Sequence, residues 1–267
     1  GVAARDDDPV MAAASFEYGN YLILDTELVL PDGEIFRTGL WASGGKAGGA
    51  LGPVRNDVFR LWTGAQGTLG IMTKMALHIN PFIRQRKVFF ISFHELAEAV
   101  EPVKTIQRRQ IGTECFLLNR FNMAALLSSE WTVPDHFPVR PGPSQSFETL
   151  KALLPPWLLT ICINGSPRHP EEKIAYEERA LRETCASLNI ELMDRLPGAH
   201  GFDRIILEEI LYPWSILKKF NYRGSVHSLC FKSPMQRVVE LEGLLHAVCG
   251  EHGYRTSSVG AYILPME

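Results

Sequence analysis

The stretch from Gly64 to Pro81, "GAQGTLGIMTKMALHINP", joins a glycine-rich turn to an apolar segment. Every second residue from Ile71 to Ile79 is apolar or threonine, which predicts a β-strand that ends before the proline. Gly67 and Gly70 stand three residues apart at the start of this strand. Glycine at such a place indicates a positive φ, a bulge, or the close approach of another group. An ordinary hairpin turn and a turn that lines a ligand therefore both fit the pattern.

A β-hairpin is predicted upstream of this stretch. The run "YLILDTELVL" (Tyr21–Leu30) is apolar and β-branched, and "PDG" (Pro31–Gly33) is a strong turn signal before "EIFRTGLW". Asp25 and Glu27 share one face of the first strand by their spacing of two. Paired carboxylates of this kind can serve acid–base catalysis, but a solvated strand face is the more common explanation and is the one expected here.

After Pro81 the pattern changes to strand, helix, strand, and it does so three times. Helices that cover one face of a sheet predict a two-layer α+β domain, with a domain boundary near residues 81 to 86. The proline-rich segment Ser128–Ser146 is predicted to be a loop or partly disordered. The units are 87–93, 94–110 and 113–119; 157–165, 170–189 and 190–195; and 225–233, 234–253 and 258–265.

Local signals place the helix ends. Ser92 with Glu95, and Ser233 with Gln236, have the spacing of capping boxes. Pro102 lies inside the first predicted helix, where it removes a hydrogen bond, so a kink or an early end is expected there.

Bulk properties exclude several classes of protein. The net charge is −3 and lysine and arginine form no long run, so nucleic acid is not an expected partner. No apolar run approaches the length of a membrane span. The 5 cysteines are widely spaced without a C-x-x-C pair, which predicts reduced core thiols in a cytoplasmic protein. The histidines are scattered, so no metal site is predicted.

Candidate catalytic residues are few. Within "NYRGSVHSLCF" (Asn221–Phe231), Arg223 could bind a carboxylate or phenolate through two hydrogen bonds, and His227 lies on an apolar strand. A surface ion pair and a buried core histidine are the alternatives. The possible acid–base groups are Asp25, Glu27, His78, Asp194, Asp203, Tyr222 and His227.

Two motifs carry a resemblance to a known family. "ELVLPDGEIFRTG" (Glu27–Gly39) and "GTLGIMTKMALHINP" (Gly67–Pro81) together resemble the second half of the FAD-binding domain of the vanillyl-alcohol oxidase superfamily, 4-cresol dehydrogenase included. The rest of the chain is similar to the substrate-binding cap of that branch. The resemblance implies an α+β fold in which residues 1–82 form the C-terminal part of the FAD-binding domain. Residues 83–267 would form an incomplete cap, with an antiparallel or mixed sheet and covering helices in ferredoxin-like strand–helix–strand repeats.

The resemblance also implies functional residues. Asn20, in Tyr18-Gly19-Asn20, stands where relatives carry a catalytic aspartate, and an amide cannot accept a proton as a carboxylate does. Arg223 and His227 would line the substrate pocket, giving Asn20, Arg223 and His227 as the catalytic candidates. The residues expected to contact FAD are Gly67, Thr68, Leu69, Gly70 and Ile71.

The implied activity is that of an FAD-dependent oxidoreductase. Its substrate would be an alcohol, a phenolic benzylic compound or a 2-hydroxy acid, oxidised by hydride transfer to the flavin. Relatives are longer, so this chain resembles a fragment that lacks the front half of the FAD domain and the C-terminus, and on its own it is expected to be inactive and free of flavin. A small-molecule substrate is the expected partner, and the resemblance allows a homodimer. A non-catalytic α+β binding module and a D-2-hydroxy-acid (lactate or glycolate) dehydrogenase are the alternatives.

Overall fold

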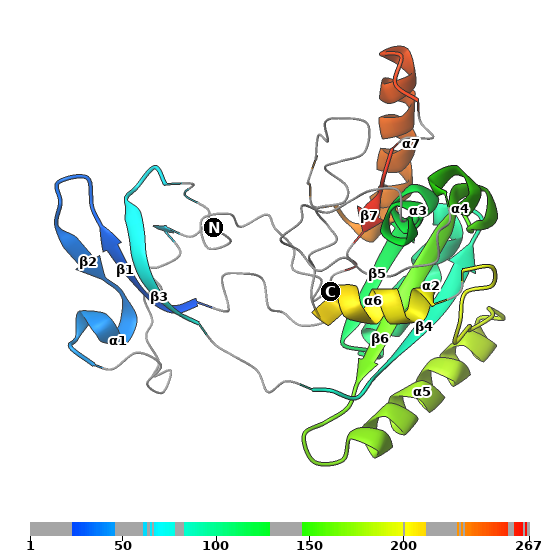
Figure 1. The fold of residues 1–267 in the computed structure, drawn as a ribbon, viewed down its shortest axis with the longest axis horizontal. Coiled ribbons are helices and arrows are strands. Elements are labelled where there is room, and N and C mark those ends of the chain that lie inside the picture. The colour runs from blue at the N-terminus through cyan, green and yellow to red at the C-terminus, as the bar shows by residue number, and fades with distance from the viewer. Residues whose placement is uncertain are drawn as a thin grey trace. The chain divides into compact units, whose positions relative to one another are not determined.

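The computed structural model describes residues 23–45, 61–62, 65, 67–77, 83–128, 146–199, 201–211, 229, 231, 233–255, 259–263 and 265. The chain divides into two compact units, Gly1–Phe82 and Ile83–Glu267, here called the N-terminal and C-terminal units (Figure 1). Among the described helices, none is both long and apolar enough to cross a membrane.

The N-terminal unit contains a three-stranded antiparallel sheet in the order β2-β1-β3. The predicted hairpin is confirmed: the N–H of Gly33 donates to the carbonyl of Leu30 at 2.9 Å, and Gly33 has φ +87°. The predicted strand that begins at Ile71 is also present, and it pairs with β1 along the edge of β1 opposite to β2. The strands are β1 (Ile23–Val29), β2 (Ile35–Arg37) and β3 (Ile71–Leu77).

The second strand of the hairpin is shorter than predicted. It ends at Arg37, and the short helix α1 (Gly39–Ala42) follows. The turn is fixed by Asp25, whose Oδ1 accepts a hydrogen bond from the N–H of Leu40 at 3.0 Å. Gly39 has φ +55° and Asp25 occupies the space that its Cβ would need, so only glycine allows the chain to leave the strand here.

The expectation of a solvated face for Asp25 and Glu27 is wrong. Both side chains are buried, and β1 has register shifts at Ile23/Asp25 and Glu27/Leu28 that interrupt its simple alternation. Glu27 accepts from Arg37 at 2.8 Å and lies 3.0 Å from Lys74 Nζ. Each carboxylate therefore holds together parts of its own unit.

The C-terminal unit is built on a four-stranded sheet in the order β4-β6-β5-β7, with every pairing antiparallel. Helix α2 (Leu96–Arg108) connects β4 to β5, and β6 lies between these two strands. Helix α5 (Pro170–Ser187) returns the chain to the free edge of β4, where Met193 exchanges hydrogen bonds of 2.8 and 2.9 Å with Phe90. The strands are β4 (Arg86–Phe93), β5 (Glu114–Asn119), β6 (Trp157–Asn164) and β7 (Tyr262–Ile263).

This arrangement has the predicted strand–helix–strand character, although Ile190–Arg195 forms only a single bridge in place of a strand. Of the third predicted strand–helix–strand repeat, the helix α7 (Met235–Glu251) and the last strand β7 are present. The first predicted strand of this repeat lies outside the described residues except for isolated positions.

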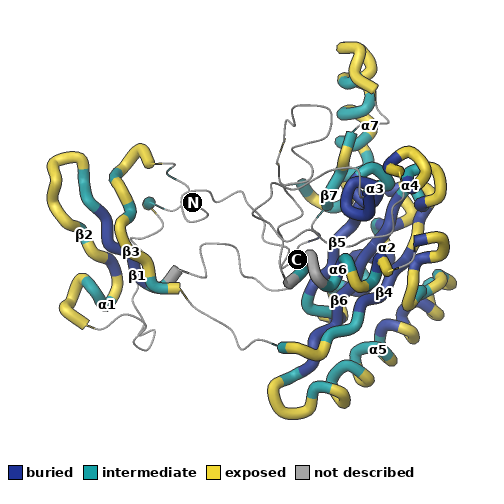
Figure 2. The backbone as a smooth tube through the Cα atoms, viewed as in Figure 1, coloured by how far each residue is buried: buried dark blue, intermediate teal, exposed yellow. Residues whose placement is uncertain are grey.

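Helices cover both faces of this sheet, so the expected two-layer arrangement is wrong (Figure 1). One apolar core lies between the sheet and α2, α5 and α7, and includes Phe89 and Leu181. A second core lies on the opposite face, under α3 (Arg120–Leu127), α4 (Phe147–Leu153) and α6 (Phe202–Leu211), and includes Phe90 and Phe202. The strands are buried from both sides, as Figure 2 shows.

The helix starts differ in detail from the prediction. Ser92 lies within β4, and the capping box of α2 is formed by Glu95 and Glu98 three residues further on. Helix α7 begins after Pro234 with no side-chain cap, so the predicted box at Ser233 is absent. An early end at Pro102 is also wrong, because α2 continues to Arg108.

Candidate functional site

The turn from Gly67 to Ile71 is open on its outer side. Gly67 has φ +83°, and no atom of the described chain lies within 4 Å of the place where a Cβ would stand. Leu69 and Ile71 expose 47% and 71% of their surface. The turn therefore presents bare backbone and apolar side chains outward.

A groove of about 270 Å³ runs beside this turn. The side chains that line it are apolar and backbone atoms add a polar share of the lining, and Trp62 is held in place by a ring contact with Phe36 at 4.8 Å between centroids. An apolar hollow next to a backbone turn is suited to a flat, largely apolar group with polar atoms at its edge. The lining residues are Leu28, Trp62, Ala65, Gly67, Leu69, Gly70, Ile71 and Met72.

The turn also carries unused hydrogen-bond donors. The N–H of Thr68 donates to the carbonyl of Ala65 at 3.0 Å, and its hydroxyl donates to the same oxygen at 2.7 Å. The N–H groups of Gly67, Leu69 and Gly70 make no hydrogen bond within the described part of the chain. Successive free N–H groups in a turn form a concave site for anionic or carbonyl oxygen.

Gly70 is needed for a different reason from the one that the sequence suggested. Its φ is +149°, and a Cβ there would lie 2.8 Å from the carbonyl oxygen of Val29 on β1. The group that approaches Gly70 closely is thus the chain's own neighbouring strand. Both glycines line the groove, but only at Gly67 is the position of a Cβ free of other atoms of the described chain.

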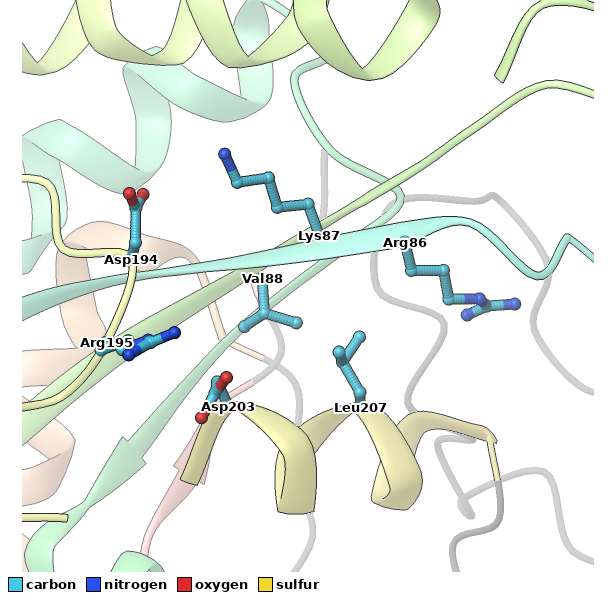
Figure 3. Close-up of a pocket in the computed structure, with 7 residues that line it drawn as sticks. All are labelled: Arg86, Lys87, Val88, Asp194, Arg195, Asp203 and Leu207. Atoms are coloured by element: carbon cyan, nitrogen blue, oxygen red, sulfur yellow. The ribbon is translucent and has the colours of Figure 1, made fainter. Parts of the chain in front are cut away.

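The C-terminal unit has a second hollow, of about 620 Å³, between β4 and α6 (Figure 3). Two of the acid–base candidates, Asp194 and Asp203, line it, but the carboxylate of Asp194 points away from α6 (Figure 3). Asp194 is already paired with Arg182 at 2.9 Å. The lining residues are Arg86, Lys87, Val88, Asp194, Arg195, Asp203 and Leu207.

Glu114 is a buried charge that the sequence analysis missed. It opens β5, its Oε1 lies 3.4 Å from Arg86 NH1, and its Oε2 is buried with no hydrogen-bond partner among the described residues. Burial raises the pKa of this carboxyl, an effect opposed by the charge of Arg86. The one available signal was an acidic residue at the head of an otherwise apolar strand.

Three of the four cysteines in the described ranges lie in the core as predicted, whereas Cys249, on α7, is only half-buried. Cys115, Cys162 and Cys185 are buried free thiols. Burial raises the pKa of Cys115 to about 12 and that of Cys185 to about 11, so neither is a thiolate at neutral pH. Across the same ranges, no group of His, Cys, Asp or Glu is arranged to hold a metal ion.

The three catalytic candidates, Asn20, Arg223 and His227, lie outside the described residues. The same is true of the acid–base candidates His78 and Tyr222. Among the predicted site residues the structure therefore describes the cofactor turn, and that turn is present as one continuous, exposed segment.

Solved structures with a similar fold were found, whereas neither a scan against protein-family models nor a search of curated proteins gave a match. A 4-ethylphenol oxidase from Gulosibacter chungangensis, solved with isoeugenol, covers 87% of this chain with a TM-score of 0.57 and 18% identity. A p-cresol methylhydroxylase with substrate bound covers 76% of it with a TM-score of 0.50 and 19% identity.

The similarity covers 47% of the first of these chains and 40% of the second, so this chain spans less than half the length of either. Identities this low establish a common fold and leave activity to be argued from the site. The resemblance predicted from the two sequence motifs is thus confirmed for the fold: the chain has the α+β fold of part of the 4-ethylphenol oxidase and p-cresol methylhydroxylase structures.

Proposed function

We propose that this chain is part of an FAD-dependent oxidoreductase, in which the N-terminal unit contributes to the flavin site and the C-terminal unit is the substrate-binding cap. The pair of motifs at Glu27–Gly39 and Gly67–Pro81 supports this, as does the fold shared with an oxidase and a hydroxylase. Both of those proteins are named for phenolic substrates, which favours a phenolic compound among the alcohols and 2-hydroxy acids considered above.

The observation that carries the proposal is the open turn at Gly67. The residues there fit a flavin ring system: a bare Cα with open space beside it, three N–H donors without a partner among the described residues, and the exposed side chains of Leu69 and Ile71 next to a groove of apolar side chains. The N–H groups of Leu69 and Gly70 would bind carbonyl oxygens at the ring edge, and the aliphatic side chains would exclude water from its face. A bound flavin would supply the two-electron oxidation itself.

The remaining assignments are part of the same proposal. Asn20, Arg223 and His227 would line the substrate pocket, with Arg223 binding an anionic group of the substrate. Asn20 would orient the substrate by hydrogen bonds, since an amide cannot serve as a base. The proposal also includes a cytoplasmic location, a small-molecule substrate as partner, and a homodimer.

The test is flavin content in the protein expressed from its complete reading frame. Ile71→Asp places a charge in the groove, whereas Ile35→Asp places the same charge on β2, outside the groove, at a residue that is 61% exposed. We expect Ile71→Asp to lose the flavin absorption band on gel filtration and Ile35→Asp to keep it, with equal circular dichroism. Equal flavin content in both variants would contradict the assignment of this turn, and a protein that never carries flavin would favour the binding-module alternative.

A further inference from the structure

Helix α7 (Met235–Glu251) is joined to the core of the C-terminal unit by its first turns. Met235, Val238 and Val239 pack against the core that α2 and α5 cover, and no residue of α7 is buried. In Figure 1 the C-terminal half of this helix extends beyond the rest of the unit, away from the other labelled helices. The outer half of α7 is therefore a surface that the described elements leave uncovered.

This uncovered surface is apolar. Leu244 and Val248 expose 57% and 43% of their surface. Leu241 and Leu245 belong to neither of the two cores of the unit. Spacings of three and four residues place these four side chains along one side of the helix. An exposed apolar patch of this kind, rimmed by polar residues, indicates a site of protein association.

Opposite charges stand at the two ends of the patch. Arg237 lies in the first turn of α7 and contacts Glu240 of its own helix at 3.2 Å, which leaves other N–H groups of its guanidinium available. Glu251 ends the helix, is exposed, and has no ion-pair partner in the part of the chain that the structure describes. Here the α7 stripe means Arg237, Leu241, Leu244, Val248 and Glu251, which follow one another at spacings of four, three, four and three.

Both end charges have the sign that their own helix disfavours. The N-terminus of a helix carries a partial positive charge and the C-terminus a partial negative charge. Arg237 is near the first and Glu251 is at the second. Each charge would therefore be stabilised by the opposite end of another helix.

The α7 stripe is complementary to itself when its direction is reversed. Arg237 and Glu251 are each seven residues from Leu244. In an antiparallel pair of α7 helices with a two-fold axis at Leu244, each Arg237 therefore meets the partner's Glu251. A parallel pair would instead place like charges side by side. Self-complementarity of this kind points to a second copy of the same chain as the occupant of the surface.

We propose that two copies of this chain pair through the outer face of α7, antiparallel about Leu244, with Arg237 and Glu251 setting the direction. The homodimer rests on the function proposed above, and this inference names its surface. The apolar side chains supply most of the attraction, because exposed ion pairs contribute little. One helix face from each copy makes a small interface, so we expect a dimer that dissociates on dilution.

The test is sedimentation equilibrium of the 267-residue chain over a range of concentrations. Leu244→Glu brings two carboxylates together at the axis and should weaken dimerisation by about tenfold or more. The matched control is Leu153→Glu, because Leu153 lies on α4 and is 58% exposed, compared with 57% for Leu244. The control should dimerise like the unchanged chain. Circular dichroism of both variants should match that of the unchanged chain.

Charge reversal tests the direction of pairing. Arg237→Glu or Glu251→Arg alone places like charges together at both ends of the stripe, and each should weaken the dimer about three- to tenfold. The double variant exchanges the two charges and should recover the original affinity. A parallel pair predicts no effect from either single change.

The proposal is overturned by a chain that stays monomeric at its highest soluble concentration, or by a dimer that Leu244→Glu and Leu153→Glu affect equally. Single charge reversals without effect, or a double variant without recovery, would also overturn it. A monomeric chain would remove the homodimer from the proposed function and leave the flavin assignment intact, because flavin content is measured separately.

Discussion

The two sheets of this molecule bury opposite kinds of residue. In the N-terminal unit the central strand buries Asp25, Thr26 and Glu27, while Ile35 and Ile71 on its neighbours are 61% and 71% exposed. In the C-terminal unit the strands bury apolar side chains on both faces, and Phe89, Phe90 and Phe116 are 0% exposed (Figure 2). The same architecture, an antiparallel sheet with helices, is thus stabilised in two different ways.

This contrast indicates how each unit is stabilised. The C-terminal unit rests on apolar area removed from water, the dominant favourable term in folding. In the described part of the N-terminal unit Leu28 is buried too, but the other buried residues of β1 make directed polar contacts: Thr26 N–H to Thr38 Oγ1 at 2.8 Å, Asp25 to Leu40, and Glu27 between two cations. Its exposed apolar residues are the kind of surface that binds a ligand or another segment.

The largest expected loss of stability comes from removing an apolar side chain from the core of the C-terminal unit. Phe116→Ala empties a fully buried position whose ring packs on Tyr262 at 5.7 Å, and it should lower the free energy of unfolding of the C-terminal unit by about 3–5 kcal/mol. Ile71→Thr keeps the β-branch at an exposed position and should change the N-terminal unit by less than about 0.5 kcal/mol. Hydrogen exchange of β6 and β3 amides measures the two units separately, and comparable losses would refute the contrast.

A smaller effect separates the two glycines of the turn. Gly70→Ala forces a side chain against Val29 at a φ that only glycine adopts readily, and should cost the N-terminal unit about 1–3 kcal/mol plus the clash. In Gly67→Ala the added Cβ lies near no atom of the described chain. The change should therefore lower the stability of the N-terminal unit only by the cost of an alanine at positive φ, about 1 kcal/mol. Exchange rates along β1 and β3 should therefore rise more for Gly70→Ala. The reverse order would show that Gly67 has a structural role of its own.

The smallest effect is a pH dependence of opposite sign in the two units. Hydrogen bonds from Lys74 and then Arg37 lower the pKa of Glu27 from 4.5 to about 2, so its stabilisation is complete above pH 4.5 and is lost as the pH falls toward 2. Burial raises the pKa of Glu114 above 4.5, so the contribution of this carboxyl to the stability of the C-terminal unit should rise on acidification from neutral pH to 4.5, against the opposite trend from Glu178, whose pKa is lowered. Urea unfolding followed by residue-resolved exchange at several pH values measures both trends. Glu27→Gln should remove the loss of stability of the N-terminal unit at low pH and leave the C-terminal unit unchanged. Glu114→Gln should remove the contribution of this carboxyl in the C-terminal unit and leave the N-terminal unit unchanged.

Much of the fold could be predicted because its signals are local. The hairpin at Pro31–Gly33 and the strand at Ile71 are specified by turn residues and by alternation within a few positions. Helix α3 was not predicted, because Asn122–Leu127 are all buried and the apolar run of β5 continues into it without a change of period. Helix α6 was missed although Phe202 and Ile206 repeat at helical spacing, so that signal was available.

The site could be predicted only in part, for a related reason. The glycine pair identified the turn, but the role of Gly70 depends on Val29, which approaches it only when β1 and β3 pair. Likewise Asp194 and Asp203 line the same hollow only because Met193 bridges to β4 and Phe202 packs on Phe90. Contacts that arise from pairing distant segments leave no pattern in a single sequence.

The insertion of β6 between β4 and β5 has a consequence for synthesis of the chain. Strand β4 (Arg86–Phe93) leaves the ribosome with three phenylalanines and an isoleucine, and its pairing partners within the described chain, β6 and Met193, both emerge much later. Until then the nascent chain displays an unpaired, aromatic edge, the kind of segment that self-associates or recruits a chaperone. Translation paused before Trp157 should therefore yield a species bound by chaperones, and release beyond Met193 should free it.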